Sequence, residues 1–499
     1  MPSLKRSVLG VVLVLSMPIA TTAQPFEEED LALAYGDKTT VSIATGSHQP
    51  ISRAPAVASV ITSQDIEAMC ATDLDQALES VPGLHVSMNH IAMKPIYVFR
   101  GITTINNPQV LMLVNGLPIT NVFWGDRSQI WGGMPLENVA RIEVIRGPGS
   151  ALYGADAFSG VINIITKTAD DIKGTETGVR TGSFNTHDAW LQHGGKMGAW
   201  DTAFYLRAGN TDGHKGIIAQ DAQSTFDQTF GSNASLAPGP LNNGRKAIDV
   251  RADLASEAWR FRAAYQQRDV SVGALGGSID PNGRGIASRL YLDLNYEQAN
   301  WAQDWDVSGV VGFFDVKEKP LDYYTLFPAG AFGGAFPNGM LAGPGHSERH
   351  AHASVSAVHT GLEEHRLRIG AGYRMEDLYE VTETKNFDAT FAPLPGGLVD
   401  ATGNPSLVYL LPHKRNVAFA FIQDEWSLTQ DWALTAGVRH DNYSDFGGTT
   451  NPRIALVWDA AYNVVVKAMH GTAFRAPSFS EQSSINPHLP PRSPPLTPA

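Results

Sequence analysis

Apolar and polar residues alternate along the chain from residue 174 onward, in segments of about ten residues separated by turn residues. In the segment 289–297, one face of an extended strand would carry Leu290, Leu292, Leu294 and Tyr296. The opposite face would carry Tyr291, Asp293 and Asn295. This period of two, with one apolar and one mostly polar face, predicts β-strands that bury only one side. Comparable segments cover residues 202–209, 247–256, 259–266, 305–315, 365–374, 416–426 and 432–441.

The connections between these segments alternate in length. Short turns occur at 255–258 and 429–431, whereas long loops rich in Gly and Pro cover 211–246, 317–347 and 379–415. Tryptophans lie near the predicted strand ends, at Trp200, Trp259, Trp305, Trp426 and Trp432. Short turns at one end, long loops at the other and an aromatic girdle are typical of an antiparallel outer-membrane β-barrel. A soluble β-sandwich is the alternative, although its strands are usually shorter and its loops more even.

The region from residue 57 to about residue 168 has a mixed pattern. Short apolar runs predict strands at 57–62, 96–101, 110–114, 142–146 and 161–165. Two helices are expected at 65–69 and 73–80, and Leu74 and Leu78 share a face of the second helix. We therefore expect a compact α/β domain over residues 56–170, which is an ordinary domain size.

The N-terminal residues 1–23 have the order of charges and apolar residues that is typical of an export signal. Lys5 and Arg6 precede an apolar run over residues 8–20, and small residues at 21–23 offer a cleavage site. A buried N-terminal helix is the alternative interpretation. Because the run is too short for a transmembrane anchor, we expect an exported chain that continues with a polar leader over residues 24–55.

Within this leader, residues 39–45 form a short β-prone run that ends at Gly46. An extended segment of this kind can add a strand to the edge of another protein's sheet. An ordinary linker accounts for the same residues equally well, so the residues alone leave both interpretations open.

Composition and charge narrow the possible classes. The 499 residues carry a formal charge of -13, which argues against a nucleic-acid partner because phosphate binding requires a basic surface. A single cysteine excludes a disulfide scaffold and a cysteine-rich metal site. The mean hydropathy of -0.14, with one long apolar run, excludes a polytopic helical membrane protein. The low content of charged residues, 17%, and the 48 glycines fit a barrel with tight turns.

The sequence offers no motif for catalysis. It has neither a His-Glu-x-x-His helix nor a Gly-x-Ser-x-Gly turn. His346, His350 and His352 could together hold a metal, yet such a cluster is more often a solvated loop or a lumen face. We therefore expect no catalytic residue, no metal site and no resident cofactor. A secreted β-rich hydrolase is the alternative of a different class.

Four blocks of sequence carry a family resemblance: VFRGI at 98–102, VLMLVNGLPI at 110–119, ARIEVIRGPGSALYGADAFSGVINIITK at 140–167 and TAFRAPSFSE at 472–481. On these blocks the chain resembles the TonB-dependent outer-membrane receptors, above all the branch of vitamin B12, ferric-siderophore and colicin receptors. The resemblance covers residues 35–480. It implies an N-terminal α/β plug domain in the lumen of a 22-stranded antiparallel membrane β-barrel. It also implies active uptake of a scarce metal chelate, such as a ferric siderophore or cobalamin.

The resemblance further implies partners and a location. The energy-coupling box of the family corresponds to Thr40, Val41, Ser42, Ile43, Ala44 and Thr45. This match favours strand pairing with TonB, the inner-membrane energy-transducing protein, over the linker interpretation. The receptor would be a monomer in the outer membrane of a Gram-negative bacterium, in contact with its lipid. The metal would arrive with the chelate ligand.

Candidate site residues follow from the same resemblance. Arg100 and Arg146 would pair with barrel glutamates, of which Glu425 is a candidate, because an enclosed cation needs a carboxylate partner. Arginines exposed to water are the alternative. Ligand contacts would come from the extracellular loops and from two plug apices, at 87–94 and 121–127. The ligand candidates are Met88, His90, Phe123 and Trp124, each of which could instead fill a loop.

The C-terminal residues depart from the family pattern. Six prolines lie in the fifteen residues from Ile485. Since proline cannot donate to a β-ladder, residues 483–499 are predicted to be a tail foreign to the family. About 13 candidate strands precede it, in an incomplete barrel over 174–482, against 22 in the family. Either the chain is a shortened and non-functional receptor product, or a smaller barrel forms. We favour the shortened product, because a narrower barrel could not hold a plug of this size.

Overall fold

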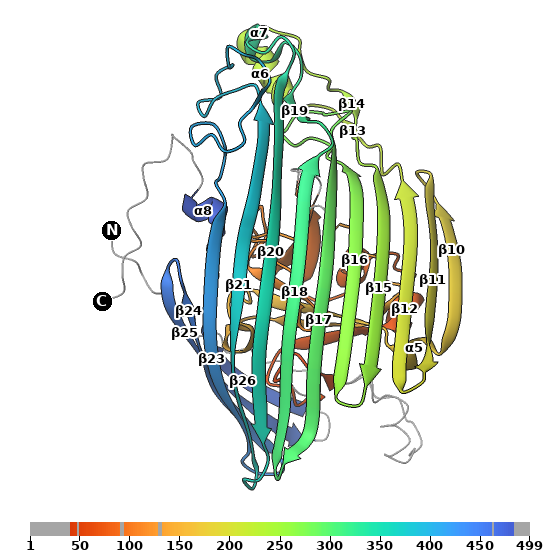
Figure 1. Cartoon of the computed structure of the whole chain (residues 1–499), viewed down its shortest axis with the longest axis vertical. Helices are drawn as coiled ribbons and strands as arrows, with labels where there is room; N and C mark the ends of the chain where they lie inside the picture. Colours follow the sequence, from red (N-terminus) through yellow and green to blue (C-terminus); the bar gives the residue numbers. More distant parts are fainter. Residues whose placement is uncertain (1–39, 47–48, 90–93, 128–131, 462–463, 484–499) are drawn as a thin grey trace.

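The computed structural model describes residues 40–46, 49–89, 94–127, 132–461 and 464–483. The predicted signal peptide, residues 24–39 of the leader, and all of the predicted tail except its first residue lie outside the described residues. The described chain forms a small α/β plug and a large antiparallel sheet that curves in front of it (Figure 1).

The plug is built on a five-stranded sheet with the order β3-β8-β9-β6-β7, and a separate hairpin pairs β4 with β5. Within the sheet, β6 and β9 are parallel and the other neighbours are antiparallel. The plug elements are β3 (Ala58–Thr62), α2 (Ser63–Ala68), α3 (Leu74–Leu78), β4 (Leu84–Met88), β5 (Pro95–Phe99), β6 (Val110–Val114), β7 (Leu117–Pro118), β8 (Val139–Arg146), α4 (Ser150–Tyr153), β9 (Gly160–Thr166) and α5 (Ala169–Ile172). The five strands predicted in this region correspond to β3, β5, β6, β8 and β9.

The two predicted plug helices are present and are capped by their own sequence. The Thr62 hydroxyl accepts a hydrogen bond from the Asp65 amide at 3.2 Å, and the Asp65 carboxylate accepts one from the Thr62 amide at 2.9 Å. This reciprocal capping starts α2 before the predicted residue. Asp73 caps α3, whose Leu74 and Leu78 are both buried in the core of the plug. The expected apolar face of the second helix is therefore confirmed.

In the part of the chain that the structure describes, thirteen strands follow one another in a single antiparallel path, which agrees with the number predicted. They are β10 (Gly174–Gly182), β11 (Thr186–Met197), β12 (Trp200–Thr211), β15 (Arg245–Ser256), β16 (Trp259–Ser271), β17 (Arg284–Ala302), β18 (Trp305–Pro320), β20 (Met340–His359), β21 (His365–Lys385), β23 (His413–Ser427), β24 (Trp432–Tyr443), β25 (Gly447–Ala461) and β26 (Val464–Gly471). Short strands β19 (Tyr324–Phe327) and β22 (Val399–Asp400) pair with β20 and β21. β10 and β26 are the two ends of this path, and within the described ranges no pairing joins them.

Side chains along each barrel strand alternate between the two faces of the sheet, as the period of two predicts. On β17, Tyr291 and Asp293 are buried on the inner face, whereas Leu290 and Leu294 are exposed on the outer face. The outer face is thus apolar, and the inner face carries the polar and charged side chains that meet the plug.

Barrel arginines hold the plug by donating hydrogen bonds to its backbone carbonyls. Arg245 donates to the carbonyl of Gly132 at 2.6 Å, and Arg439 donates to the carbonyl of Leu152 at 2.8 Å. Arg289, fully buried, donates to the carbonyl of Ile119 at 3.3 Å. These contacts come from strands spread across the sheet, so the plug is anchored at several points of its circumference.

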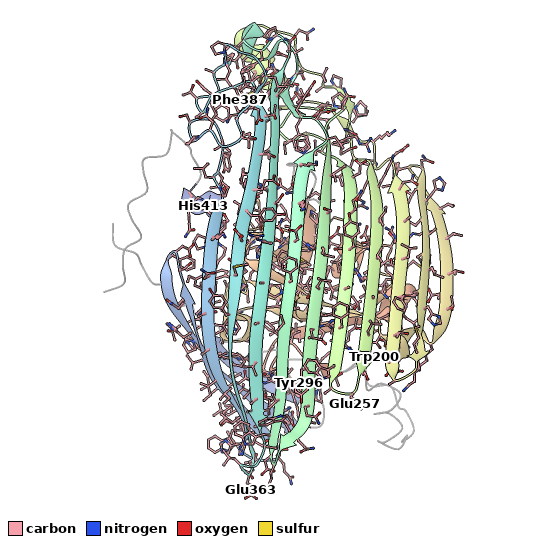
Figure 2. The ribbon with its side chains drawn as sticks, in the orientation of Figure 1. Trp200, Glu257, Tyr296, Glu363, Phe387 and His413 are labelled. Carbon is pink, nitrogen blue, oxygen red and sulfur yellow. The ribbon has the colours of Figure 1, made fainter. Side chains whose placement is uncertain are left out.

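The two ends of the sheet differ in their connections. The end with tight turns carries Trp200, Glu257, Tyr296 and Glu363, and the end with long loops carries Phe387 and His413 (Figure 2). The long loops contain α6 (Ala222–Phe230) and α7 (Ala331–Gly334), which pack together through phenylalanine rings. Among the described residues, no helix has both the length and the apolar content needed to cross a membrane.

Candidate functional site

The predicted coupling segment, residues 40–45, is folded against the plug. β1 (Thr40–Val41) pairs antiparallel with β2 (Gln49–Pro50) in a small hairpin. The side chains of Val41, Ile43 and Ala44 are buried in an apolar cluster with residues of β6, β8 and β9. The segment is therefore covered on its side-chain face by the plug core.

The carboxylate of Glu143, on β8, binds the backbone of this segment. Its Oε2 accepts hydrogen bonds from the amides of Ser42 and Ile43, both at 3.0 Å. Glu143 is fully buried, and Arg141 donates to its other oxygen at 2.9 Å. The Tyr153 hydroxyl donates to the carbonyl of Ile43 at 2.9 Å. Burial and the nearby Glu143 carboxylate raise the pKa of Tyr153, which keeps this phenol protonated as a donor.

Barrel residues bind two carbonyls of the same segment and the carbonyl of Gly46, which follows it. Arg453 donates to the carbonyl of Ala44 at 2.9 Å, and Arg368 donates to that of Gly46 at 2.9 Å. The Gln423 side chain donates to the carbonyl of Thr45 at 3.3 Å. We call Glu143 and these three barrel donors, Arg368, Gln423 and Arg453, the clasp. Because the clasp holds backbone groups, a partner strand can pair with the segment only after the clasp opens.

A second buried glutamate binds the plug apex at the long-loop end. Glu348, on β20, accepts hydrogen bonds from the amides of Val122 at 2.8 Å and Phe123 at 2.9 Å. His350 lies 3.0 Å from the same carboxylate. The carbonyls of the two apex residues accept hydrogen bonds from the amides of Phe479 at 2.9 Å and Ser480 at 3.0 Å, at the start of α8 (Phe479–Ser483). The apex is thus held on both sides by parts of the chain outside the plug.

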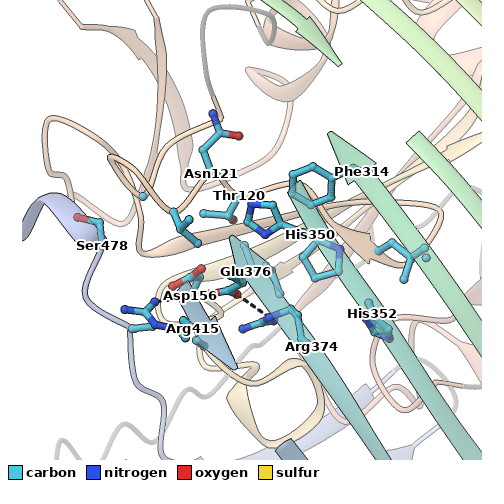
Figure 3. A pocket seen from close by; sticks show the side chains of 18 of the residues that line it. Thr120, Asn121, Asp156, Phe314, His350, His352, Arg374, Glu376, Arg415 and Ser478 are labelled. Atoms are coloured by element: carbon cyan, nitrogen blue, oxygen red, sulfur yellow. Dashed lines mark ion pairs between the residues drawn. The ribbon is translucent and has the colours of Figure 1, made fainter. Parts of the chain in front are cut away.

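A small cavity of about 60 Å³ lies between this apex and the barrel wall (Figure 3). The plug contributes Asp156 to its lining, and the barrel contributes His350, His352, Arg374 and Glu376. Arg374 and Glu376 form an ion pair, with 2.6 Å between Nε and Oε1. Burial is the main cause that raises the pKa of Asp156 to about 6, while Arg374 opposes the shift. A cavity of this size has room for water molecules but not for a metal chelate.

Comparison with known proteins agrees with this architecture. The family model "TonB-dependent Receptor Plug Domain" matches residues 50–161, and the model "TonB dependent receptor-like, beta-barrel" matches residues 178–498. The chain belongs to the TonB-dependent receptor family. The barrel match covers more than half of the chain and also runs through the Pro-rich residues at its end.

Curated relatives of this receptor include two proteins of Vibrio cholerae. The vitamin B12 transporter BtuB is 24% identical over 94% of this chain and 67% of its own length. The iron-regulated outer membrane virulence protein is 27% identical over 89% of this chain and 61% of its own length. The receptor therefore spans about two thirds of the length of the curated relatives that it matches.

Solved structures with the same fold include two siderophore receptors. The ferric yersiniabactin uptake receptor FyuA from Yersinia pestis matches with a TM-score of 0.60 at 15% identity, over 86% of this chain and 65% of its own. The siderophore receptor PirA from Acinetobacter baumannii matches with a TM-score of 0.60 at 19% identity, over 85% of this chain and 62% of its own. At these identities the likeness supports the plug-and-barrel fold.

The predicted ion pairs between plug arginines and a barrel glutamate are wrong in the described part of the receptor. Arg146 instead donates to the carbonyl of Pro82 at 2.7 Å, within the plug. Burial and the neighbouring Arg100 lower the pKa of Arg146. Arg100 is exposed, and no ion pair of its guanidinium occurs among the described residues. Glu425 accepts a hydrogen bond from Gln423 of its own strand at 3.3 Å.

Ion pairs of both polarities join the plug region to the barrel. The plug residue Glu137 lies 3.1 Å from the guanidinium of Arg180 on β10 and 3.9 Å from that of Arg207 on β12. With the reverse polarity, Arg53 lies 2.5 Å from Asp459 on β25, and Lys94 faces Glu318 on β18 at 3.8 Å. Glu137 lies beside Asn138 in a loop, and no pattern in the sequence identifies it as the partner of a barrel arginine.

The four predicted ligand residues have different environments. Met88 is exposed at the end of β4, and His90 lies outside the described residues. Phe123 is buried, and its ring stacks on His346 at a centroid distance of 4.5 Å. Trp124 is half-buried beside Tyr409, at a centroid distance of 5.0 Å. Met88 and Trp124 therefore retain surface for a ligand, whereas Phe123 serves packing.

The histidine cluster lines the lumen and contacts aromatic and carboxylate groups. His350 stacks on Phe314 at 4.1 Å, and His352 lies 3.1 Å from the Ser354 hydroxyl. Within the described ranges, no group of three or more histidine, cysteine, aspartate or glutamate side chains is arranged to hold a metal. The lumen-face interpretation of the three histidines agrees with these positions.

Proposed function

We propose that this receptor takes up a scarce metal chelate, such as a ferric siderophore or cobalamin, across the outer membrane of a Gram-negative bacterium. The observation that supports this function is the clasp, which stores a strand-forming segment by its backbone at the tight-turn end of the barrel. A stored segment of this kind suits a receptor that signals an occupied binding site to a partner on the other side of the membrane. The names of its relatives, a vitamin B12 transporter and siderophore receptors, support the same ligand class.

The energy-coupling partner in this proposal is TonB, which would pair with Thr40, Val41, Ser42, Ile43, Ala44 and Thr45 as an added strand. Once the clasp and Tyr153 release their bonds and β1 separates from β2, the segment presents a free row of amides and carbonyls. The proposal also includes export by the signal at residues 1–23 and insertion as a monomer among outer-membrane lipids. It includes no resident cofactor. The metal belongs to the chelate and is cargo.

The chelate would bind at the long-loop end, where Met88 and Trp124 retain exposed surface. The loop phenylalanines add an aromatic wall, since Phe226 packs against Phe332 at a centroid distance of 4.8 Å while Phe391 is left exposed. Aromatic surface of this kind suits a large, flat or aromatic chelate better than a small hydrophilic solute. His90, which lies outside the described residues, is the further proposed contact.

Uptake of labelled chelates by cells tests this function. The full chain is expressed in a strain that lacks its own cobalamin and siderophore receptors, and uptake of radiolabelled cyanocobalamin and ferric enterobactin is measured with and without TonB. TonB-dependent accumulation of either chelate supports the proposal. Ile43→Pro, which removes one backbone amide from the coupling segment, should abolish uptake and leave surface binding intact. Absence of both binding and uptake in cells with heat-modifiable, inserted receptor would contradict it and favour a non-functional product.

A further inference from the structure

Residues 474–483, which lie after β26, cross the plug apex, and we call them the strap. The amide of Phe479 donates a hydrogen bond to the carbonyl of Val122 at 2.9 Å. The amide of Ser480 donates to the carbonyl of Phe123 at 3.0 Å. The strap therefore meets the apex by pairing backbone with backbone, and this contact satisfies two buried carbonyls of the plug.

The strap is shaped by hydrogen bonds within its own sequence. The amide of Ser478 donates to the carboxylate of Glu481 at 2.9 Å, and the amide of Glu481 donates to the hydroxyl of Ser478 at 3.2 Å. This reciprocal pair caps the start of α8. Arg475 donates to both oxygens of the same carboxylate, at 2.5 and 2.9 Å. Because these bonds fix the turn locally, the strap can be held in place from only a few points.

One barrel side chain, Arg415 on β23, contacts the strap at three positions (Figure 3). Its Nη2 donates to the carbonyl of Pro477 at 2.8 Å and to the side-chain oxygen of Gln482 at 3.1 Å. Its guanidinium lies over the ring of Phe479, 4.9 Å from the centroid. A guanidinium presents its donors in a rigid, planar fork, so Arg415 fixes the strap on both sides of Phe479 at once.

Two barrel carboxylates fix Arg415 in turn. Asp445, in the turn between β24 and β25, accepts a hydrogen bond from its Nε at 2.8 Å. The carboxylate of Glu376, on β21, lies 3.6 Å from its Nη1. These carboxylates balance the charge of a side chain that is only 2% exposed. The N–H groups that point to the strap are thus held in direction by the barrel wall.

The strap also connects the two rings that lie beside the apex. The hydroxyl groups of Ser480 and Tyr409 are 2.7 Å apart. The amide of the same serine binds the carbonyl of Phe123, which directly precedes Trp124. The rings of Trp124 and Tyr409 lie 5.0 Å apart at an interplanar angle of 33°. Because Ser480 contacts the chain beside both rings, the position of the strap sets the spacing between them.

We propose that Arg415 is a positioning residue for chelate binding. It holds the strap on the apex, and the strap keeps Trp124 and Tyr409 at the spacing that an aromatic chelate meets. A side chain that is 2% exposed offers no surface to a chelate, so its effect on affinity acts through the strap. The inference rests on the proposed function for its ligand, whereas the hold of Arg415 on the strap can be measured without one.

Hydrogen exchange and chelate binding of the full chain in detergent test this role. In Arg415→Ala, exchange at the amides of Phe479 and Ser480 should accelerate about tenfold or more, because hydrogen bonds from a charged donor are lost. Affinity for cyanocobalamin or ferric enterobactin should fall about tenfold, as expected when the competent apex conformation drops to about a tenth of the molecules. The matched control is Arg260→Ala, which removes a 40% exposed arginine at the tight-turn end of β16 and should change neither quantity.

Two further variants separate positioning from folding. Arg415→Lys keeps the charge beside Glu376 and Asp445 but lacks the fork, so it should recover part of the slow exchange and part of the affinity. If Arg415→Ala loses heat-modifiable migration on gels, Ser480→Ala/Gln482→Ala replaces it. This variant weakens the strap from its own side, and both changes should then be a few-fold.

The outcomes are distinct. Unchanged exchange at Phe479 and Ser480 in a folded Arg415→Ala protein overturns the proposal. Accelerated exchange with parental chelate affinity overturns it too, because Arg415 would then serve the strap without serving the ligand. If the parent protein binds neither chelate, the proposed function fails, and the exchange result alone decides whether Arg415 holds the strap.

Discussion

The carboxylate of Glu143 accepts a hydrogen bond from the backbone amide of Ile43 at 3.0 Å. This bond connects the coupling segment to a plug strand one hundred residues later in the chain. A charged acceptor shared by two buried amides is a strong interaction, since hydrogen bonds to charged groups contribute about 1.5–3 kcal/mol each. Releasing the segment from the plug therefore costs free energy. That cost is set by the plug on one side and by Arg453 and its neighbours on the other.

Glu143→Gln should loosen the coupling segment. The amide keeps one acceptor oxygen but loses the charge, and its NH₂ group faces the amides of Ser42 and Ile43 or the donor Arg141. We expect the free energy of opening to fall by about 1–3 kcal/mol, which speeds local exposure by roughly an order of magnitude or more. Thiol labelling of Ala44→Cys measures this exposure, in a Cys70→Ser background because Cys70 is itself exposed.

The matched control for this labelling experiment is Glu67→Gln, which changes an exposed carboxylate on α2 of the same plug. It should leave the labelling rate of Ala44→Cys unchanged. Equal labelling in the Glu143→Gln and parent proteins would show that the apolar burial of Val41 and Ile43, not the carboxylate, limits opening.

Glu348→Ala should free the plug apex from the barrel. The amides of Val122 and Phe123 would lose their acceptor in a buried site, at a cost of about 2–4 kcal/mol for the two groups together. Hydrogen exchange at these amides should accelerate, and the thermal midpoint of the protein should fall. Glu363→Ala, at the exposed tight turn between β20 and β21, removes a carboxylate without a described contact and should change neither quantity. Unchanged exchange at the apex in Glu348→Ala would exclude this role.

The fold was largely predictable because its main signals are local. The period of two along segments such as 289–297 reports which face of a strand meets the lumen, and the structure buries Tyr291 and Asp293 accordingly. Loop lengths and tryptophans likewise mark the ends of strands without reference to distant residues. Exact helix starts were less predictable: a helix was expected from residue 65, but Thr62 caps α2, which begins at Ser63.

Within the candidate site, only the continuous segment carries a sequence signal. Residues 40–45 have a β-prone sequence of their own, whereas the groups that hold them come from Glu143, Arg453 and other distant positions. Those groups bind backbone atoms, which every residue has. The pattern of side chains in the sequence therefore does not indicate these contacts. The same limit explains the error over Arg146: a sequence shows that a cation needs a partner, but not that the carbonyl of Pro82 supplies it.

Plug stability should depend on pH through Asp75. Burial, followed by the charge of Asp73, raises the pKa of this carboxyl to about 6, while its hydrogen bond from Tyr97 opposes the shift. Because the folded-state pKa lies above the unfolded value of about 3.9, the folded plug binds the proton more tightly. The resulting stability is fully present below about pH 4 and is lost as the pH rises through about 6. Thermal midpoints measured between pH 4 and pH 7 should reveal this loss in the parent protein.

Asp75→Asn should flatten that profile. The neutral amide avoids the cost of a buried charge, so at pH 7 the variant should be more stable than the parent by up to about 2–3 kcal/mol, and the difference should vanish near pH 4. Asp170→Asn, at an exposed position on α5, is the control and should run parallel to the parent. Parallel curves for Asp75→Asn and the parent would mean that other groups set the pH dependence.

Ligand contact and packing can be separated at the two plug apices. Met88→Ala removes an exposed side chain, so it should weaken chelate binding while leaving the thermal midpoint within about 1 °C, as expected for a surface change within about 0.5 kcal/mol. Phe123→Ala removes a buried ring that stacks on His346, so it should lower stability by about 3–5 kcal/mol. Equilibrium binding of ferric enterobactin or cyanocobalamin, measured beside thermal unfolding, distinguishes the two effects. A Met88→Ala protein with parental affinity for every chelate that the receptor binds would remove Met88 from the ligand site, and the half-buried Trp124 would then be the apex residue to test next.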